Sequence, residues 1–226
     1  MKRPAISIIV PVYNLEFYVE RTLTSLLQQT VEDLEFVVVD DGSTDDTSAI
    51  VAEFAARDSR FRVFRKQNGG HGSACNLGIE HARGEYVLFC DGDDWLSPDT
   101  CRRMLELARG YDVDLLLGNL TYFHANQTRS SFTPLRSGGE RLLDARDRSL
   151  LFTNFATPCG RMYRRELFDD PAIRFLPRIL FADVSFAPKT YYAARRIAYV
   201  NESFYNYDLT RPTQSMQQRD ARLLNV

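Results

Sequence analysis

The sequence is poor in the residues that build metal and redox centres. It has four cysteines, Cys75, Cys90, Cys101 and Cys159, without a C-x-x-C pair, and its three histidines show no ligand spacing. These absences exclude a zinc-binding motif and a disulfide framework. We therefore expect reduced thiols in a cytoplasmic protein.

The chain also lacks strong charge and long apolar runs. With a formal net charge of −2 over 226 residues, it gives no bulk electrostatic reason to bind nucleic acid. No apolar stretch is long enough to span a bilayer. What is present, 44% hydrophobic and 26% charged residues, is typical of a globular domain. Two arginine clusters are expected to be solvated faces: Arg161, Arg164 and Arg165, and Arg195 with Arg196.

Apolar runs and helical patterns alternate along the first 120 residues. Strands are predicted at 6–10 (ended by Pro11), 35–39, 62–65, 85–90 and 114–117. Helices are predicted at 17–29, 73–83 and 98–107, and a further helix starts at Ser43 as N-cap, with Asp45 and Asp46 in its first turn, and ends near Ala56. This order predicts an α/β fold with a parallel sheet and helices on both faces.

The second part of the chain has a different sequence pattern. Polar runs surround short apolar segments, followed by a predicted helix at 183–194 and a strand at 197–200. We expect the halves 1–120 and 121–226 to form one domain. Residues 217–226 resemble the opening of a helix, so we expect a longer parent protein with further domains.

Carboxylates follow two of the predicted strands directly. Asp40 and Asp41 end one apolar run, and Asp91, Asp93 and Asp94 end another. Open α/β sheets bind their ligands at the carboxyl ends of strands. Clustered carboxylates repel one another unless a cation lies between them, and a divalent cation carrying a nucleotide diphosphate satisfies that need. The pattern favours a nucleotide-using transferase.

Four segments in register resemble the family 2 glycosyltransferases of the GT-A fold. They are residues 7–14 (SIIVPVYN), 39–45 (VDDGSTD), 68–70 with 76–78 (NGG and NLG), and 91–94 (DGDD). The resemblance implies a Rossmann-like, mostly parallel sheet flanked by helices, with a smaller C-terminal region on the acceptor side. It also implies sugar transfer from a nucleotide donor with inversion at the anomeric carbon.

The resemblance places the donor on residues from several loops. Pro11, Val12 and Tyr13 would cradle the base, and the tyrosine ring can stack on it. Asp41 would accept the imide N–H of uracil, which favours a UDP-linked sugar, and Asp40 would support the turn. Asn68 begins a glycine-rich loop that can meet a phosphate. A more distant residue, Arg211, would clamp the diphosphate from a lid formed by residues 206–216.

The DGDD segment matches the D-x-D element of the family. Asp93 is expected to bind Mn²⁺ or Mg²⁺ directly, and Asp91 to contact the donor ribose or the metal's water shell. Gly92 allows close backbone approach. Asp94 is a secondary candidate placed toward the acceptor. Trp95 has two open interpretations, as a platform for a sugar face or as a core anchor.

The general base is expected at Asp183, in a segment that resembles the family's Glu-Asp-x-x-Phe element. The preceding glutamate is replaced by Ala182. A second departure is Cys75, which stands where family members often carry an arginine before Asn76. His71 could substitute for that arginine, but as a lone loop histidine it is left outside the catalytic set.

The resemblance implies a glycan or cell-envelope polysaccharide as acceptor. It also implies a cytoplasmic location, compatible with peripheral association at the inner face of the cell membrane. Two alternatives remain open. One is a nucleotidyltransferase, which needs a basic glycine-rich loop that residues 11–14 do not provide. The other is a non-catalytic nucleotide- or glycan-binding module of a larger protein, which the departures at Cys75 and Ala182 keep open.

Overall fold

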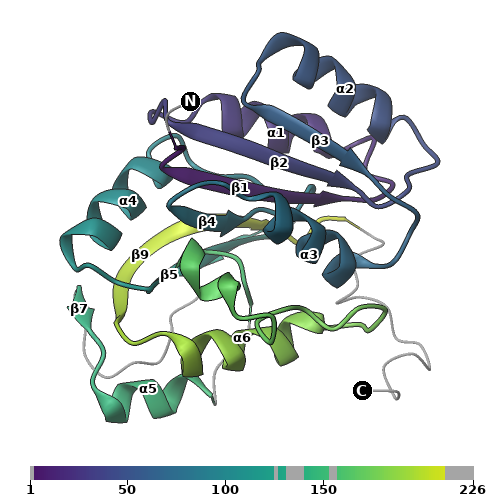
Figure 1. The fold of residues 1–226 in the computed structure, drawn as a ribbon. Helices are drawn as coiled ribbons and strands as arrows, with labels where there is room; N and C mark the ends of the chain where they lie inside the picture. The colour runs from purple at the N-terminus through teal and green to yellow at the C-terminus, as the bar shows by residue number, and fades with distance from the viewer. Residues whose placement is uncertain (1–2, 125–126, 131–139, 153–156, 212–226) are drawn as a thin grey trace.

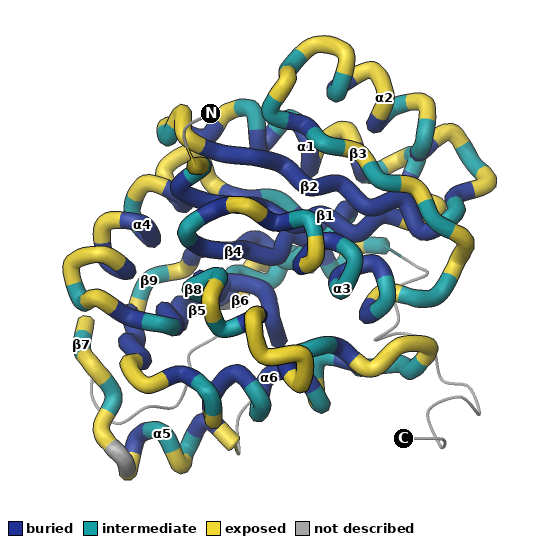
Figure 2. The backbone as a smooth tube through the Cα atoms, in the orientation of Figure 1, coloured by how far each residue is buried: buried dark blue, intermediate teal, exposed yellow. Residues whose placement is uncertain are grey.

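A nine-stranded mixed sheet runs through the computed structural model, which describes residues 3–124, 127–130, 140–152 and 157–211 (Figure 1). Its strands lie in the order β3-β2-β1-β4-β8-β5-β9-β7, and β6 pairs with β5. The predicted α/β class is confirmed. The strands are dark in Figure 2 because they are buried, whereas exposed residues lie mainly on the outer helices and loops.

The elements have the following bounds. The strands are β1 Ile6–Val12, β2 Leu34–Asp40, β3 Phe61–Arg65, β4 Tyr86–Phe89, β5 Leu115–His124, β6 Gln127–Ser130, β7 Arg141–Leu142, β8 Arg161–Arg164 and β9 Ile197–Asp208. The helices are α1 Val19–Leu27, α2 Thr47–Arg57, α3 His71–His81, α4 Thr100–Gly110, α5 Ala145–Leu151 and α6 Ala182–Ala193, with a 3-10 turn at Arg165–Asp169.

The first four strands form the parallel sheet that the sequence predicts. β1 and β2 are buried at every position, which explains their nearly unbroken apolar sequences. β1 was expected to stop at Pro11, but it continues to Val12, pairing Pro11 with Val39 and Val12 with Asp40. Pro11 lies near the strand end, where one missing N–H donor is tolerated.

The other half of the sheet is mixed. β8 lies antiparallel between β4 and β5, and β9 runs parallel to β5. Because β5 and β9 therefore point the same way as β1 and β4, the end of β9 reaches the edge where β1, β2 and β4 end. β5 runs through residue 120, and the division into halves at that residue stays a prediction.

Helices cover both faces of the sheet. α1 packs beside α2, and α3 lies against β1 and β2 from the other side, next to α6 (Figure 1). The inner side of α6 is fixed by Phe186, which stacks on Phe175 at 3.8 Å and contacts Phe89 edge-on at 5.8 Å. This aromatic packing sets the rotation of α6, and therefore where Asp183 points.

Several helix starts differ from the predictions: α1 and α4 begin two residues later than expected, at Val19 and Thr100, and α2 and α3 also differ. α2 begins at Thr47, so the expected N-cap at Ser43 is wrong. The Ser43 hydroxyl instead accepts the Asn14 N–H, and Asp45 accepts the Thr47 and Glu16 N–H groups before the helix begins. α3 begins at His71, two residues earlier than expected.

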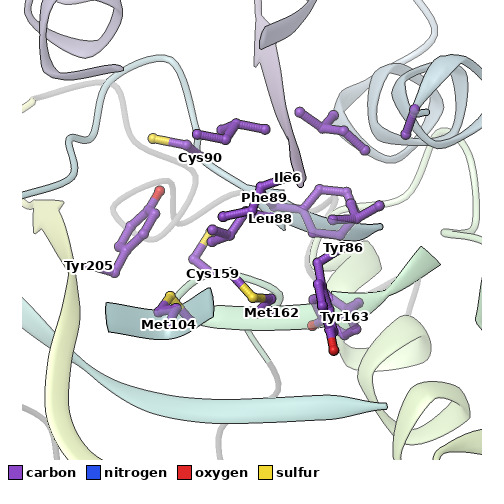
Figure 3. Close-up of a cluster of buried hydrophobic side chains, with 14 of the residues drawn as sticks. Ile6, Tyr86, Leu88, Phe89, Cys90, Met104, Cys159, Met162, Tyr163 and Tyr205 are labelled. Carbon is purple, nitrogen blue, oxygen red and sulfur yellow. The ribbon is translucent and has the colours of Figure 1, made fainter. Parts of the chain in front are cut away.

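Several cysteines and one arginine are buried in the core. All four cysteines are free and buried, and Figure 3 shows Cys90 and Cys159 in a cluster with Phe89, Met162 and Tyr205. Arg161, expected on a solvated face, is only 5% exposed and donates to the Cys159 carbonyl, which corrects that prediction. Within the described ranges, no helix combines the length and apolar character that crossing a membrane requires.

Candidate active site

The carboxyl ends of the parallel strands form the edge where the predicted site residues meet. Tyr13 follows β1, Asp41 follows β2, the 91–94 turn follows β4, and Arg211 lies just beyond β9. Tyr13 is 45% exposed, so its ring is accessible. Parallel strand order therefore gathers polar groups that lie far apart in the sequence.

Pro11 and Val12 are buried and act through their backbone. The Pro11 carbonyl accepts the Gly92 N–H at 3.3 Å, and the Val12 carbonyl accepts the Asp41 N–H at 2.9 Å. The end of β1 thereby holds the two acidic turns. Gly92 is required there, because a Cβ would lie 2.6 Å from the Val12 side chain. The close approach predicted for Gly92 is thus a contact with the protein itself.

The two neighbouring aspartates after β2 have different partners. Asp40 is buried, accepts the Ser43 N–H at 2.8 Å and the Ser48 hydroxyl at 2.5 Å, and so supports the turn as expected. Burial would raise its pKa, but these hydrogen bonds outweigh burial and lower it.

Asp41 anchors the glycine-rich loop. Its carboxylate accepts the N–H groups of Gly69 and Gly70 and pairs with Lys66 Nζ at 2.7 Å. The Gly69 N–H lies within hydrogen-bonding distance of both carboxylate oxygens, and the Asp41 side chain is only 3% exposed. Asn68, at the start of the loop, is exposed, and its backbone lies against the turn at Gly42.

Asp91 and Asp93 lie at the edge with different neighbours. Asp91 Oδ1 is 2.9 Å from His71 Nε2, and Asp93 Oδ2 is 2.7 Å from an Arg211 guanidinium nitrogen. Burial, followed by repulsion from Asp91, raises the Asp93 pKa. A cation beside these two carboxylates would relieve that repulsion.

These two carboxylates fit a hard divalent cation that shares its ligands with a substrate. No group of three or more His, Cys, Asp or Glu residues that could hold a metal occurs in the part of the chain that the structure describes. Mg²⁺ is commonly held by one or two carboxylates together with substrate phosphates rather than by a complete protein cage. Asp93 and Asp91 match that arrangement.

Asp94 differs from both, because it is almost fully buried. Its Oδ2 accepts the Tyr205 hydroxyl at 2.6 Å and its Oδ1 accepts the Asp208 N–H at 2.8 Å. The same Tyr205 oxygen accepts the Asp91 N–H at 3.0 Å. The sequence suggested that Asp94 faces the acceptor. The structure shows instead that Asp94 is buried and fastens the end of β9 to the 91–94 turn.

Helix α1 supports the same turn from the other side. Arg21 donates to the Asp93 carbonyl at 2.5 Å and to Asp208 Oδ2 at 2.6 Å, and Thr22 donates its hydroxyl to the Gly92 and Asp94 carbonyls. Arg21 also stacks on Trp95 at 4.1 Å, while Phe123 lies 4.6 Å from the same indole. These two contacts hold the indole in place, and Trp95 remains partly exposed.

His71 lies in the site, although the sequence analysis left it outside the catalytic set. It begins α3 beside Cys75, whose sulfur lies 3.7 Å from His71 Nε2. Desolvation opposes the protonated imidazole, yet Cys75 and Asp91 raise the His71 pKa well above its ordinary value. The side chain remains 45% exposed. The cation that an arginine at position 75 would supply is thus available from His71, one helical turn earlier.

Asp183 is the second residue of α6 and lies near His71. Burial raises its pKa, and the positive charge of His71 partly opposes that shift. Its carboxylate accepts the Val184 N–H at 3.1 Å, and Phe181 rather than Asp183 is the N-cap. Asp183 is therefore not a capping residue, and most of its hydrogen-bonding capacity is uncommitted in the described contacts.

Arg211 bridges the D-x-D element and α1. Besides the ion pair with Asp93, its guanidinium lies 5.9 Å from the centre of the Tyr18 ring. The sequence prediction put this residue in a lid at 206–216. Residues 206–208 instead belong to β9, and residues 212–216 lie outside the described residues. A groove of about 650 Å³ opens nearby, lined by Phe17, Arg21, Trp95 and neighbouring residues of α1 and 96–98.

No local pattern in the sequence marks Tyr205, Asp208 or Arg21 as a site residue. Each acts through a partner at least 70 positions away, fixed by the pairing of β9 or the packing of α1. His71 did carry a signal, since its spacing of four from Cys75 puts both on one side of a helix.

An open α/β sheet that gathers loop carboxylates and an exposed aromatic ring at its carboxyl edge has the arrangement in which such sheets bind ligands. The sequence model described as "Glycosyl transferase family 2" matches residues 7–170. The chain therefore belongs to glycosyl transferase family 2.

Known proteins agree with this assignment. The uncharacterized glycosyltransferase EpsJ of Bacillus subtilis (strain 168) is 35% identical over 211 residues, covering 90% of this chain and 61% of EpsJ. The glycosyltransferase GlyA of Streptococcus pneumoniae serotype 4 is 32% identical over 221 residues, covering 93% of this chain and 31% of GlyA. The chain thus spans less than two thirds of these relatives.

Among solved structures, residues 1–349 of S. aureus TarS in complex with UDP-GlcNAc superpose with a TM-score of 0.83 at 27% identity. That superposition covers 96% of this chain and 61% of TarS 1–349. The similarity confirms the GT-A-like arrangement that the sequence motifs predict.

The buried contacts of Asp94 give a testable stability prediction. Asp94→Ala leaves the Tyr205 hydroxyl and the Asp208 N–H without their acceptor, and we expect it to lower the free energy of unfolding by about 2–4 kcal/mol. Tyr205→Phe should cost about 1–2 kcal/mol, and the double variant less than the sum, because both remove one hydrogen bond. Urea denaturation of the four proteins measures this; additive losses would contradict the network.

The Asp94→Asn substitution keeps the shape of the side chain and removes its ability to ionise. Burial, followed by repulsion from Asp93 and Asp91, raises the Asp94 pKa well above its usual value. A raised folded-state pKa favours folding at low pH and costs stability as pH rises through that pKa. We therefore expect the difference in stability between wild type and Asp94→Asn to move in favour of the asparagine as pH rises. A difference that is constant with pH would contradict this.

Proposed function

We propose that this chain transfers a sugar from a uridine diphosphate sugar to a hydroxyl of a cell-envelope glycan, with inversion. The observation that carries the proposal is the convergence of Asp91, Asp93 and Asp183 with two cationic side chains at one sheet edge. The family membership and the UDP-GlcNAc bound by the similar TarS structure support the same donor class.

The donor base would bind between Tyr13 and Asp41. Tyr13 offers an exposed ring for stacking, and the Asp41 carboxylate would accept the imide N–H of uracil in place of one of its present donors. Lys66 and two backbone N–H groups stabilise the ionised carboxylate, so Asp41 acts as an acceptor. Cytosine has no N–H at that ring position and would leave this acceptor unmatched.

The diphosphate would lie between the acidic turn and the cations around it. Asp93, with Asp91, would hold Mn²⁺ or Mg²⁺, and that ion would neutralise the charge developing on the leaving diphosphate. His71 and Arg211 are within reach of the same carboxylates, and both can donate to phosphate oxygens. In that state Arg211 exchanges its contact with Asp93 for one with the diphosphate.

Asp183 would act as the general base. It would accept the proton of the acceptor hydroxyl while that oxygen attacks the anomeric carbon from the face opposite the diphosphate, which gives inversion. Partial burial raises the pKa of this carboxyl group, so it is more basic than an exposed aspartate, and the positive charge of His71 partly opposes that shift.

Removing the base should abolish transfer and spare binding. We expect Asp183→Asn to lower UDP release from UDP-sugars by at least about 100-fold, the lower range of general-base effects. Its affinity for UDP should be unchanged, because the base does not touch the donor diphosphate. Asp46→Asn, at an exposed aspartate preceding α2, is the matched control.

The pH profile should report the same residue. Because the Asp183 pKa is raised, the base becomes protonated at a higher pH than an ordinary aspartate. The acid limb of the pH profile of kcat/KM is therefore expected above pH 4, because the ordinary pKa of an aspartate is about 3.9. If Asp183→Asn turned over substrate at the wild-type rate, Asp183 would be excluded as the base. If the wild-type protein bound UDP without turnover, the non-catalytic module would be favoured.

Base selectivity tests Asp41 without a mutation. Because an unmatched buried acceptor costs binding free energy, UDP should bind at least about tenfold more tightly than CDP. Isothermal titration with Mn²⁺ present measures both affinities. Equal affinity for the two nucleotides would remove Asp41 from base recognition.

A further inference from the structure

The outward side of α6 carries an apolar stripe that the active site does not use. Val184, Pro188 and Tyr192 follow one another at intervals of four and so lie on one side of the helix. Val184 is 55% exposed and Tyr192 86% exposed. We call these three residues the α6 outer face. The opposite side of the helix is buried through Phe186 and Thr190.

Exposed apolar side chains are concentrated around this part of the fold. Of eight large hydrophobic side chains exposed in the described residues, five lie between positions 142 and 192: Leu142, Phe152, Leu176, Val184 and Tyr192. Phe152 packs edge-on against Tyr191, with ring centres 6.0 Å apart, which joins the end of α5 to α6. Figure 1 places α5 and α6 together at the lower side of the molecule.

The charge of this region is opposite to that of the whole chain. Residues 174–196 contain five arginine or lysine residues and one acidic residue, whereas the complete chain has a formal net charge of −2. The acidic residue is Asp183, which faces the active site. The segment that contains the α6 outer face therefore carries net positive charge.

The basic side chains in and next to this region bind carbonyl groups rather than carboxylates. Lys189 donates to the Arg174 carbonyl at 3.0 Å, and Arg148 of α5 donates to the carbonyls of Tyr191 and Ala194. Such contacts fix the side chains without neutralising them. The carboxylates of the neighbouring segment have other partners: Glu140 pairs with Arg103, and Asp147 pairs with Arg141.

We propose that the α6 outer face rests on an anionic lipid surface. An apolar stripe about one side chain wide enters a headgroup boundary, while lysine and arginine beside it meet lipid phosphates. Tyrosine suits that boundary because its ring is apolar and its hydroxyl stays hydrated. Charge complementarity favours this occupant over a second copy of the chain, whose own α6 region would be equally basic.

This contact would place the chemistry at the membrane. Asp183 immediately precedes Val184, so docking of α6 holds the proposed general base close to the lipid surface. An acceptor glycan attached to a lipid would then present its hydroxyl near that carboxylate. This last consequence rests on the proposed function, whereas lipid binding by the α6 outer face does not.

Vesicle co-sedimentation tests the proposal with the protein as it exists. Wild type should sediment with vesicles containing phosphatidylglycerol, less so in high salt, and not with pure phosphatidylcholine. Tyr192→Glu removes the most exposed apolar anchor and adds a repelled charge, so it should lower the partition coefficient at least about tenfold. Phe17→Glu is the matched control, since Phe17 is 85% exposed on the α1 side, and it should bind like wild type.

Each other outcome overturns the proposal. Absence of binding to anionic vesicles, or equal binding by Tyr192→Glu, would exclude the α6 outer face as a lipid contact. A wild-type dimer in light scattering that Tyr192→Glu converts to a monomer would assign the stripe to a second copy. UDP affinity measured on the same samples shows whether the variant is folded and keeps this test separate from that of the donor site.

Discussion

One buried carboxyl group connects the two halves of the active edge. Asp94 accepts hydrogen bonds from the Tyr205 hydroxyl and the Asp208 N–H, and Tyr205 also holds the backbone of Asp91. These contacts join the turn after β4 to the end of a strand more than 100 positions later in the chain. A buried acidic group is costly unless its hydrogen bonds are complete, so this junction tolerates little displacement. Asp93 and Arg211, one on each side of the junction, therefore meet at 2.7 Å.

At the same edge, aspartates with identical side chains differ in role because their hydrogen-bonding partners differ. Asp40 and Asp94 are buried with complete hydrogen bonds, and they shape turns. Asp41 pairs with Lys66 and anchors the glycine-rich loop. Asp91 and Asp93 are more accessible, and they meet the side chains of His71 and Arg211. Asp183, partly buried and near His71, is the carboxylate suited to take a proton.

The sequence predicted what depends on local pattern. β1 and β2 are recognisable because both faces of each strand are buried, and the acidic turns are recognisable because carboxylates end those strands abruptly. β8 was missed: its four residues, Arg161–Arg164, have no alternation, and they become a strand only through pairing between β4 and β5. The structural role of Asp94 was missed for a related reason. DGDD contains three chemically identical side chains, and only the long-range partner of each distinguishes them.

The most direct test of the donor site is thermal unfolding in the presence of UDP, with and without Mn²⁺. A ligand that binds only the folded state raises the midpoint according to its concentration relative to Kd. We predict a rise with UDP that requires Mn²⁺, is lost in Asp93→Ala and persists in Asp46→Ala. A UDP-induced rise that does not depend on Mn²⁺ or on Asp93, or no rise at all, would contradict the assignment of this edge as a metal-assisted nucleotide-sugar site.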